Sequence, residues 1–491
     1  MSDKHYDARG NRTKRYGAGD EVLTSVPLYL LALLYAAPAS YSVYHVLLYK
    51  RDPRSAMGWI IACIFLPFAG PVAYYLFGIN RVRNRALGIR RKFLSIAYEA
   101  RVPVAALLSP DVPGIEQIGT RITGRALLAG NTVCVLHNGE QAYPAMLASI
   151  RAARQRVFLA TYILKVDHTG RAFADALAEA VARGVSVMVL VDGIGELYSW
   201  RSPSRLLRKR GVAVARFLPP KLFPPNIHIN LRNHRKLLIV DQEIAYAGGM
   251  NIGDDQTAIA GQPRQVTDVH FSLRGPVVAE LAGVFCRDWQ FATGVLIDSA
   301  GLPVPIPQGD VRCRVIPDGP DDAMDALALT IQTIVSSAGT SVEIMTPYFL
   351  PSRGLVAALQ SAALRGARVR IVLPGKNNLF YVHWAHRNVL TELLGWGVEV
   401  YYQPAPFCHS KLLCIDSEYS LIGSANLDPR SLRLNYELGI EVFSRQLNAE
   451  LCTHIQAVID GSIRVTAEDL MNRSVPVRLR DAAANLFSPY L

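Results

Sequence analysis

The fold is decided by the stretch His409-Ser-Lys411-Leu-Leu-Cys-Ile-Asp416, which is followed by Gly423-Ser424-Ala-Asn426. The same arrangement occurs upstream as His234-Arg-Lys236-Leu-Leu-Ile-Val-Asp241, followed by Gly248-Gly249-Met-Asn251. Every matching position is displaced by 175 residues, from 234 to 409. The chain therefore contains an internal duplication, and its two copies are expected to build two similar halves.

Each copy predicts a β-hairpin. The apolar run between Lys and Asp predicts a buried strand, and side-chain alternation places the His and the Lys on one face. The Asp lies roughly 17 Å beyond the Lys along an extended chain, off that face. Asp-Gln-Glu and Asp-Ser-Glu predict turns in which the Asp side chain bonds its own backbone. A returning strand, 244–248 or 420–423, is then expected to lay Asn251 beside His234 and Asn426 beside His409.

An imidazole, an ammonium group and an amide gathered at one point suit a phosphodiester. The Lys supplies charge, the Asn supplies hydrogen bonds, and the His acts as a nucleophile or proton carrier. One copy alone has a single His, which can serve as the attacking group or as the acid that protonates the departing alkoxide, but not as both. Two copies that face each other supply both groups.

These residues resemble the phospholipase D superfamily, whose signature is H-x-K-x4-D-x6-G-[SG]-x-N in two copies. Within it, the segments 232–236, 346–350, 423–431 and 488–491 are most similar to bacterial cardiolipin synthases. The resemblance implies an α/β fold of two phospholipase D-like repeats, with mixed sheets flanked by helices. The repeats are expected to form one pseudo-twofold catalytic unit, preceded by a transmembrane hairpin of two helices.

The resemblance also implies roles for individual residues. An acidic residue in the family orients a catalytic His through Nδ1; Glu437 fits this spacing, whereas Asp268 fits less well and is alternatively a surface acid. Gly249 stands where the second copy has Ser424, so the first half lacks one hydroxyl donor. The expected catalytic residues are His234, Lys236, Asp241, His409, Lys411 and Asp416, and the expected substrate-binding residues are Asn251, Asn426, Ser424, Glu437 and Asp268.

The amino-acid composition limits the classes of molecule that the protein is expected to bind. The chain has 491 residues, and 50% of them are hydrophobic, which predicts a membrane segment. The net charge of +12 predicts an anionic partner, either lipid headgroups or nucleic acid. Seven cysteines form no CxxC or zinc-like spacing, so we expect reduced thiols, no metal and no cofactor. Cys408, beside His409, is expected to be a small packing residue.

Two uncharged apolar segments, 22–48 and 57–77, are each long enough to cross a bilayer as a helix. Basic residues precede the first segment and follow the second, which favours cytoplasmic termini and a catalytic part on the cytoplasmic side of a bacterial inner membrane. A cleaved signal peptide ending near Ala37-Pro-Ala39 is the alternative. The expected regions are a basic tail (1–21), the hairpin (22–80), a basic juxtamembrane linker (81–125), repeat 1 (126–305) and repeat 2 (306–491).

Other segments allow two interpretations each. The Pro-rich segment 217–225 and the aromatic segment 375–384 either contact lipid or pack within the protein. The basic segment 81–92 either holds anionic headgroups or flanks a membrane span. Arg430 and Arg433 either bind a second phosphate or are solvated. Within repeat 1 a strand (157–164), a helix (170–183) and a strand (185–191) are predicted, with 346–373 as their repeat.

The family resemblance predicts phosphatidyl transfer between two phosphatidylglycerol molecules through a phosphatidyl-histidine, with His234 as nucleophile. Hydrolysis to phosphatidic acid is the main alternative, because water competes with the lipid hydroxyl as acceptor. A nuclease or an inactive membrane scaffold fits less well, given the apolar segments and two complete signatures. We therefore expect phosphatidylglycerol, other anionic phospholipids and the membrane as partners, and no nucleic acid; the sequence carries no signal of the oligomeric state.

Overall fold

The structure is a computed structural model that describes residues 18–50, 53–66, 68–78, 114–220, 231–258, 263–297, 305–319 and 325–488. The chain divides into two compact units, residues 1–84 and 85–491, which are considered separately. The expected basic segment 81–92, the greater part of the Pro-rich segment and the tail 1–17 lie outside the described residues.

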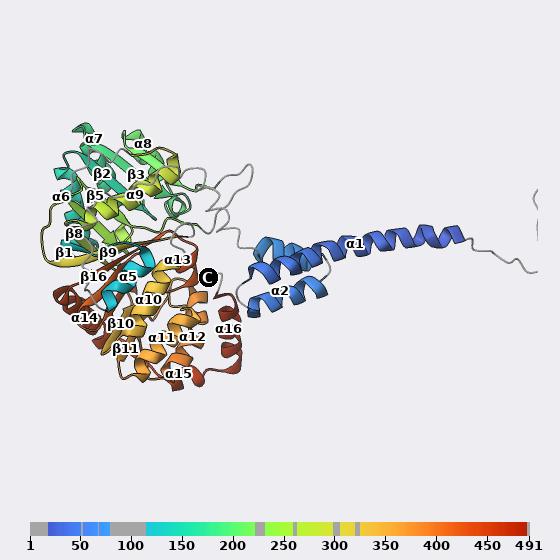
Figure 1. The fold of residues 1–491 in the computed structure, drawn as a ribbon. Coiled ribbons are helices and arrows are strands. Elements are labelled where there is room, and N and C mark those ends of the chain that lie inside the picture. The colour runs from blue at the N-terminus through green and yellow to red at the C-terminus, as the bar shows by residue number, and fades with distance from the viewer. Residues whose placement is uncertain are drawn as a thin grey trace, which may run out of the picture. The chain divides into compact units, whose positions relative to one another are not determined.

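The N-terminal unit is helical. It contains α1 (Ala18–Tyr49), α2 (Pro53–Phe65), α3 (Ala69–Ala73) and a π-helical turn η1 (Tyr74–Gly78) (Figure 1). The prediction of one continuous helix over 57–77 is wrong, because α2 ends at Phe65 and Phe68 takes a left-handed φ of 61°. Leu66 precedes a proline, whose ring disfavours helical backbone in the residue before it.

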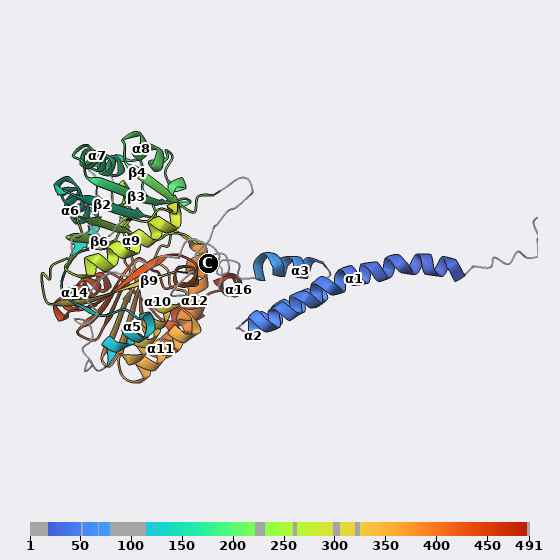
Figure 2. The ribbon, with the colours of Figure 1, turned by 45° about the horizontal axis from the view of Figure 1, so that its top comes forward.

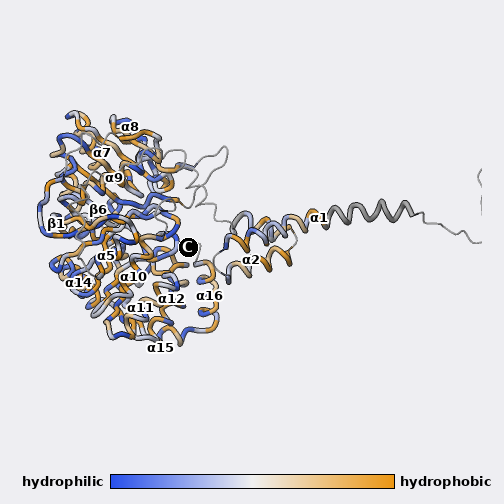
Figure 3. The backbone as a smooth tube through the Cα atoms, viewed as in Figure 1, coloured by the Kyte–Doolittle hydropathy of each residue, from blue (hydrophilic) through white to orange (hydrophobic). Residues whose placement is uncertain are grey.

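Many large apolar side chains of this unit are exposed, and apolar residues run along α2 and the described part of α1 (Figure 3). A small buried cluster, Val46, Cys63 and Tyr74, holds the helices together. Among the described residues, no helix meets both the length and the apolar composition that crossing a bilayer requires.

The C-terminal unit is built on one sheet of fifteen strands, whose order mirrors itself about the central pair β9–β1. Outward from β9 the order is β16, β15, β14, β10, β11, β12 and β17; outward from β1 it is β8, β6, β5, β2, β3 and β4. The strands of the first half are β1 (Leu128–His137), β2 (Arg156–Thr161), β3 (Ser186–Asp192), β4 (Ala213–Phe217), β5 (Leu237–Val240), β6 (Ile244–Gly248) and β8 (Val269–Arg274). Those of the second half are β9 (Val311–Asp318), β10 (Ser341–Met345), β11 (Arg368–Pro374), β12 (Glu399–Gln403), β14 (Leu412–Ile415), β15 (Tyr419–Gly423), β16 (Glu437–Phe443) and β17 (Ile463–Val465).

The sheet is mixed. Strands β2, β3 and β4 run parallel, as do β10, β11 and β12, whereas the motif hairpins β5–β6 and β14–β15 are antiparallel. The predicted α/β fold with two repeats and a mixed sheet is therefore confirmed. A separate two-stranded sheet joins β7 (Val266–Thr267) to β13 (Phe407–Cys408), one strand from each repeat.

Helices cover both faces of the sheet (Figures 1 and 2). In repeat 1 these are α6 (Asn138–Ala152), α7 (His168–Ala182), η3 (Gly195–Tyr198), α8 (Pro203–Lys209), η4 (Asp254–Gln256) and α9 (Val277–Thr293). In repeat 2 they are α10 (Ala326–Ser337), α11 (Arg353–Leu364), α12 (Phe380–Leu394), α13 (Pro429–Arg433), α14 (Arg445–Asp460), α15 (Ala467–Met471) and α16 (Val475–Leu486), with α5 (Ile115–Thr123) packed on α10. Each repeat has its own apolar core, which α6 and α7 close in the first and α10, α11 and α12 close in the second.

The predicted strand, helix and strand of repeat 1 are confirmed as β2, α7 and β3. Helix α7 begins where the Asp167 side chain accepts a hydrogen bond from the backbone of Gly170, and α11 begins in the same way at Ser352. The repeat of the first strand is displaced from its predicted place: β10 ends at Met345, so Thr346–Leu350 follows the strand instead of forming it.

Candidate active site

Both motif histidines lie immediately before a hairpin that belongs to their own repeat. His234 and Lys236 precede β5, and His409 and Lys411 precede β14. The hairpins themselves form as predicted, with Leu237 opposite Ala247 and Leu412 opposite Ile422. The strands are buried on both faces, which fixes the direction in which each hairpin presents its first residues.

Each histidine is held in place by the other repeat. The backbone N–H of His234 donates to the carbonyl of Tyr436 at 2.9 Å, within a short parallel bridge between Asn233 and Tyr436. The N–H of His409 donates to the carbonyl of Thr267 at 2.8 Å, where β13 and β7 meet. The residues that follow Tyr436 and Thr267 in the chain are Glu437 and Asp268. The two bridges therefore place an acid of each repeat beside the histidine of the other repeat.

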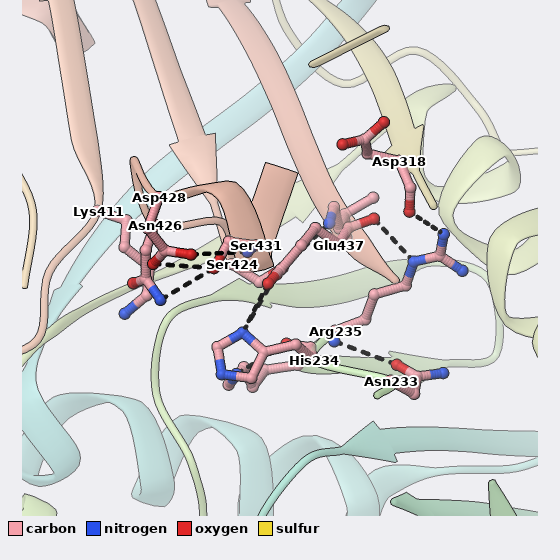
Figure 4. Close-up of polar contacts among 12 residues, drawn as sticks. Asn233, His234, Arg235, Asp318, Lys411, Ser424, Asn426, Asp428, Ser431 and Glu437 are labelled. Atoms are coloured by element: carbon pink, nitrogen blue, oxygen red, sulfur yellow. Dashed lines mark hydrogen bonds and ion pairs between the residues drawn. The ribbon is translucent and has the colours of Figure 1, made fainter. Parts of the chain in front are cut away.

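The two acid–histidine pairs are therefore crossed. Nδ1 of His234 lies 3.0 Å from Oε1 of Glu437, and Nδ1 of His409 lies 2.8 Å from Oδ2 of Asp268 (Figure 4 shows the first pair). Both carboxylates are fully buried, while each imidazole keeps a small exposed fraction. A carboxylate at Nδ1 fixes the ring and leaves Nε2 for the reacting atoms. Asp268 is thus a buried partner of a histidine, and the alternative of a surface acid is wrong.

The two lysines are placed alike. Nζ of Lys236 donates to the carbonyl of His234 at 2.7 Å, and Nζ of Lys411 donates to the carbonyl of His409 and lies 3.0 Å from its Nδ1. Both lysines are buried. The alternation that predicted His and Lys on one face describes this arrangement, although both residues precede the regular strand.

Burial dominates the electrostatics of the cluster. It lowers the pKa of His409 to about 4, with Lys411 acting in the same direction and Asp268 opposing. It also lowers the pKa of His234, which Glu437 partly restores. The pKa of Lys236 falls well below its ordinary value, again through burial first, and Lys411 lowers it further. An anion bound between these groups would restore their charged forms, because it supplies the countercharge that the site lacks.

The difference between Ser424 and Gly249 has a steric cause. Oγ of Ser424 donates to Oε2 of Glu437 at 2.5 Å and accepts from the N–H of Leu438. A Cβ added at Gly249 would lie 2.8 Å from Oδ2 of Asp268 and 3.0 Å from Nζ of Lys411. The first half therefore has no room for the hydroxyl. Ser424 bonds Glu437, and Glu437 and Asp268 contact the histidines. The predicted contact of these three residues with substrate stays a prediction.

The motif asparagines have partners of their own. Oδ1 of Asn251 accepts from the N–H of Ile163 at 3.3 Å. Nδ2 of Asn426 donates to Oγ of Ser431 at 3.2 Å, and the buried Oδ1 of Asn426 has no hydrogen-bond partner among the described residues. Their predicted contact with phosphate oxygens stays a prediction.

The motif aspartates lie outside the cluster. Asp241 and Asp416 take left-handed φ values of 51° and 52° in their turns. The carboxylate of Asp241 accepts from the backbone N–H groups of residues 154–156, at the start of β2, and that of Asp416 accepts from residues 339–341, at the start of β10. Their catalytic assignment is therefore corrected, and they bond the neighbouring strand, not their own turn as predicted. Burial would raise the pKa of Asp416, but these donors outweigh it and lower the pKa.

A buried ion network behind His234 was not predicted. Arg235 forms a close ion pair with Asp288 of α9, and its guanidinium donates to the carbonyl of Glu437 at 2.8 Å and to that of Asp318 at 3.0 Å. Nδ2 of Asn233 donates to Asp288 at 2.9 Å. Arg235 therefore joins α9, β9 and β16 at the point where β16 begins with Glu437 (Figure 4 shows the contacts with Glu437 and Asp318).

Aromatic residues line the approach to each histidine. The ring of Tyr162 meets that of His234 edge-on with centroids 4.9 Å apart, and Nζ of Lys236 lies 5.5 Å from the Tyr162 centroid. In repeat 2, Phe407 lies 6.0 Å from His409. Arg430 of α13 lies close enough to Tyr162 to lower the pKa of the phenol, although burial, the larger effect, raises that pKa overall. Arg430 thus belongs to the surroundings of the site.

Among the described residues, no group of three or more His, Cys, Asp or Glu side chains is arranged to hold a metal ion. The seven cysteines are free thiols, and Cys408 is buried, as a packing residue would be. Lys236 and Lys411 are buried cations of the protein that a phosphate could contact here.

Comparisons with known proteins agree with this geometry. A family profile described as "Cardiolipin synthase, PLD-like domain" matches residues 146–289 and 331–459, and one described as "Phospholipase_D-nuclease N-terminal" matches residues 37–78. The major cardiolipin synthase of Bacillus subtilis is 29% identical over 490 residues, covering 95% of this chain and 100% of that protein. Cardiolipin synthase A of Pseudomonas entomophila is 31% identical, covering 94% and 97%, and that of Pseudomonas aeruginosa is 32% identical, covering 91% and 93%.

A solved structure shares the fold. The phosphatidylserine synthase of Haemophilus influenzae superposes with a TM-score of 0.59 at 14% identity, covering 77% of this chain and all of that one. The first profile spans more than half of the chain, and relatives above 30% identity extend over nine-tenths of it. The chain therefore belongs to the cardiolipin synthase family of phospholipase D-like proteins.

Proposed function

We propose that the protein is a phosphatidyltransferase that makes cardiolipin and glycerol from two molecules of phosphatidylglycerol. The observation that carries the proposal is the crossed pairing of His234 with Glu437 and of His409 with Asp268. Each histidine has Nδ1 occupied by a carboxylate, so two Nε2 atoms remain for one phosphorus. One serves as nucleophile and the other as general acid and base.

In the first half-reaction, Nε2 of His234 attacks the phosphorus, and the bond from phosphorus to the headgroup glycerol breaks. The imidazolium of His409 gives its Nε2 proton to the departing glycerol oxygen. The bound phosphodiester anion favours this protonated form, since it raises a pKa that burial and Lys411 otherwise lower. The assignment of His234 as nucleophile follows the family resemblance, and the near-symmetric halves allow the reverse.

In the second half-reaction, neutral His409 takes the proton from a hydroxyl of a second phosphatidylglycerol. The resulting oxygen attacks the phosphorus, and the bond from phosphorus to His234 breaks. Lys236 and Lys411 hold the non-bridging oxygens throughout, which stabilises the charge that develops in both transition states. Asn251 and Asn426 are proposed as further donors; rotating the Asn426 amide by half a turn would present Nδ2 where the unpartnered Oδ1 now lies.

The same proposal places the N-terminal unit in a bacterial inner membrane as a helical hairpin, with the catalytic unit on the cytoplasmic side. The exposed apolar side chains of α1 and α2 support it, including Leu33, Leu47, Met57 and Phe65, because water disfavours so many in one small unit. The proposed regions are those expected from the sequence, with the hairpin at 22–80 and the repeats beginning near 126 and 306. A membrane position would supply the acceptor lipid and limit water as a competitor.

The test is an assay of purified, detergent-solubilised protein with phosphatidylglycerol as the only lipid. Cardiolipin with an equal amount of glycerol supports transfer, whereas phosphatidic acid without cardiolipin identifies a hydrolase and overturns the proposal. His234→Ala and His409→Ala are each expected to abolish turnover. Lipid phosphate bound covalently to the protein should be lost in the variant that lacks the nucleophile.

A further inference from the structure

The loop after β3 exposes three large apolar side chains within four residues. Leu197 and Tyr198, at the end of η3, are 70% and 61% exposed, and the Trp200 side chain is fully exposed at 103%. Large apolar side chains gathered on a protein surface commonly mark an interaction site. This surface, Leu197 to Trp200, is called the first rim below.

The backbone of the first rim is firmly held. Oδ1 of Asp192 accepts from the N–H groups of Ile194 at 2.8 Å and Gly195 at 2.9 Å. Oγ of Ser199 accepts from the N–H of Val166 at 2.9 Å. A Cβ at Gly195 would lie 1.8 Å from the carbonyl of Tyr162, so the loop packs closely on the strand end. The apolar side chains therefore point outward from a fixed loop.

The first rim lies beside the active site. The ring of Tyr198 lies 6.1 Å from that of Tyr162, which in turn lies 4.9 Å from the ring of His234. Only one aromatic ring thus separates the rim from the catalytic imidazole. A surface that binds at this rim therefore delivers its molecules next to the reacting nitrogen.

Repeat 2 has a matching feature. The loop after β11 leads into Phe380, which is 60% exposed and whose ring lies tilted against that of Trp384 with centroids 4.8 Å apart. That loop is tied to the site through Tyr348, whose hydroxyl donates to Asn378 at 2.8 Å and whose ring lies 6.4 Å from Phe407 beside His409. The duplicated fold therefore places one exposed aromatic loop near each histidine. The second rim is Leu379 to Tyr381.

The charge around the rims is positive. Arg201, Arg205, Arg208 and Lys209 are exposed on and before α8, and Lys376 is exposed beside the second rim. No Asp or Glu occurs in residues 197–210 or 375–381. Aromatic and apolar side chains flanked by Arg and Lys are typical of proteins that lie at the surface of an anionic bilayer. A twofold contact between two copies would instead bring these like charges together.

We propose that the two rims dock the mouth of the active site into an anionic phospholipid surface, with Trp200 entering the region between headgroups and acyl chains. This inference rests on the proposed lipid chemistry and adds to it the surface that admits the substrate. The N-terminal unit would then tether the protein, while the rims orient the catalytic unit so that a phosphatidylglycerol headgroup reaches Lys236 and Lys411 without leaving the bilayer.

The direct test compares the tryptophan emission of the full chain with that of Trp200→Phe, so that the difference isolates Trp200. The protein is reconstituted in vesicles of phosphatidylglycerol and phosphatidylcholine whose acyl chains carry bromine. We expect the difference emission to be blue-shifted from its position in water and quenched by the bromolipids. A difference emission quenched by iodide and not by bromolipid overturns the proposal.

Two other occupants give distinct outcomes that also overturn it. A difference emission that shifts with protein concentration in detergent and is not quenched by bromolipid indicates that the rims contact a second copy of the protein. Emission quenched by an added single-stranded oligonucleotide, and not by bromolipid, indicates nucleic acid. Because fluorescence requires no turnover, these results are independent of whether the enzyme makes cardiolipin.

An activity assay separates docking from chemistry. Leu197→Ser combined with Trp200→Ser should raise the apparent KM for phosphatidylglycerol in vesicles about tenfold or more, from the loss of buried apolar surface. Turnover of a short-chain phosphatidylglycerol below its micellar concentration should be unchanged. Trp396→Ser is the matched control, because Trp396 is half exposed and lies just past Leu394, at the end of α12 opposite the second rim. Equal effects in the control and the rim variant would contradict the proposal.

Discussion

Glu437→Gln tests the crossed pairing most directly. It keeps the size of the side chain and leaves an oxygen for Ser424, but it removes the charge that lies 3.0 Å from Nδ1 of His234. A hydrogen bond to a buried charged group contributes about 1.5–3 kcal/mol, which corresponds to roughly a 10- to 150-fold loss of kcat when the charge matters only in the transition state. Losing the imidazole tautomer as well extends the loss toward about 10⁴-fold, as in other carboxylate–histidine pairs.

The variant should also change the pH profile of kcat/KM. Burial lowers the pKa of His234, and Glu437 is the main group that opposes this effect. Without the carboxylate the pKa falls further, so His234 stays neutral and able to attack at lower pH. The acidic limb set by this histidine is therefore expected to move to lower pH. The assay is cardiolipin formation in mixed micelles between pH 4 and 9.

Glu441→Gln is the matched control. Glu441 is equally buried on the same strand, four residues further, but pairs with Arg314 at 2.6 Å and not with a histidine. It should lose stability and keep both kcat and the position of the acidic limb. If Glu437→Gln retained kcat within about threefold, or if its acidic limb stayed where it is in the wild type, the inferred control of His234 from the other repeat would be wrong.

Three further predictions follow from the site and its supports. Gly249→Ala should lower kcat at least about tenfold, because its Cβ would displace Asp268 from His409, whereas Gly395→Ala, whose Cβ would meet nothing closer than 3.5 Å, should be silent in the same assay. Arg235→Met should destabilise the protein by about 3–5 kcal/mol in a denaturant titration, since it leaves Asp288 buried without its cation. Arg353→Met, which removes one partner of an exposed ion pair, should cost about 1 kcal/mol or less. Equal losses in the two variants would contradict the inference that burial sets the cost. The pKa of His409, about 4, lies below the value of about 6.5 for an unfolded chain, so the contribution of neutral His409 to stability is complete above pH 6.5 and is lost as the pH falls towards 4. His409→Asn should therefore reduce the slope of the unfolding free energy against pH by up to about 1.4 kcal/mol per pH unit in that window. An unchanged slope would contradict the lowered pKa.

The sequence predicted what depends on local pattern. Apolar runs and turn residues were enough to place β5–β6 and β14–β15, and the identical spacing of His234 and His409 was enough to predict two facing half-sites. Helices α7 and α11 followed from their apolar periodicity, and their caps at Asp167 and Ser352 obey the same local rules. These features require no knowledge of distant parts of the chain.

What depends on tertiary contact was not predictable. Nothing in the motif indicates that Asp268 serves His409, because the bridge between β7 and β13 joins segments 141 residues apart. The aspartates Asp241 and Asp416 were misassigned for the same reason, since the backbone N–H groups that donate to their carboxylates lie at the starts of strands that become neighbours only in the folded sheet. The full exposure of Trp200 likewise depends on packing that the sequence does not state, whereas the end of α2 follows from the proline after Leu66 and was readable in the sequence.

The exchange of acids between the repeats limits how such a chain can change over generations. A substitution at Glu437 changes the surroundings of His234, which is encoded some two hundred codons earlier. Neither copy of the duplicated segment can therefore accumulate substitutions at these positions without a compensating substitution in the other copy.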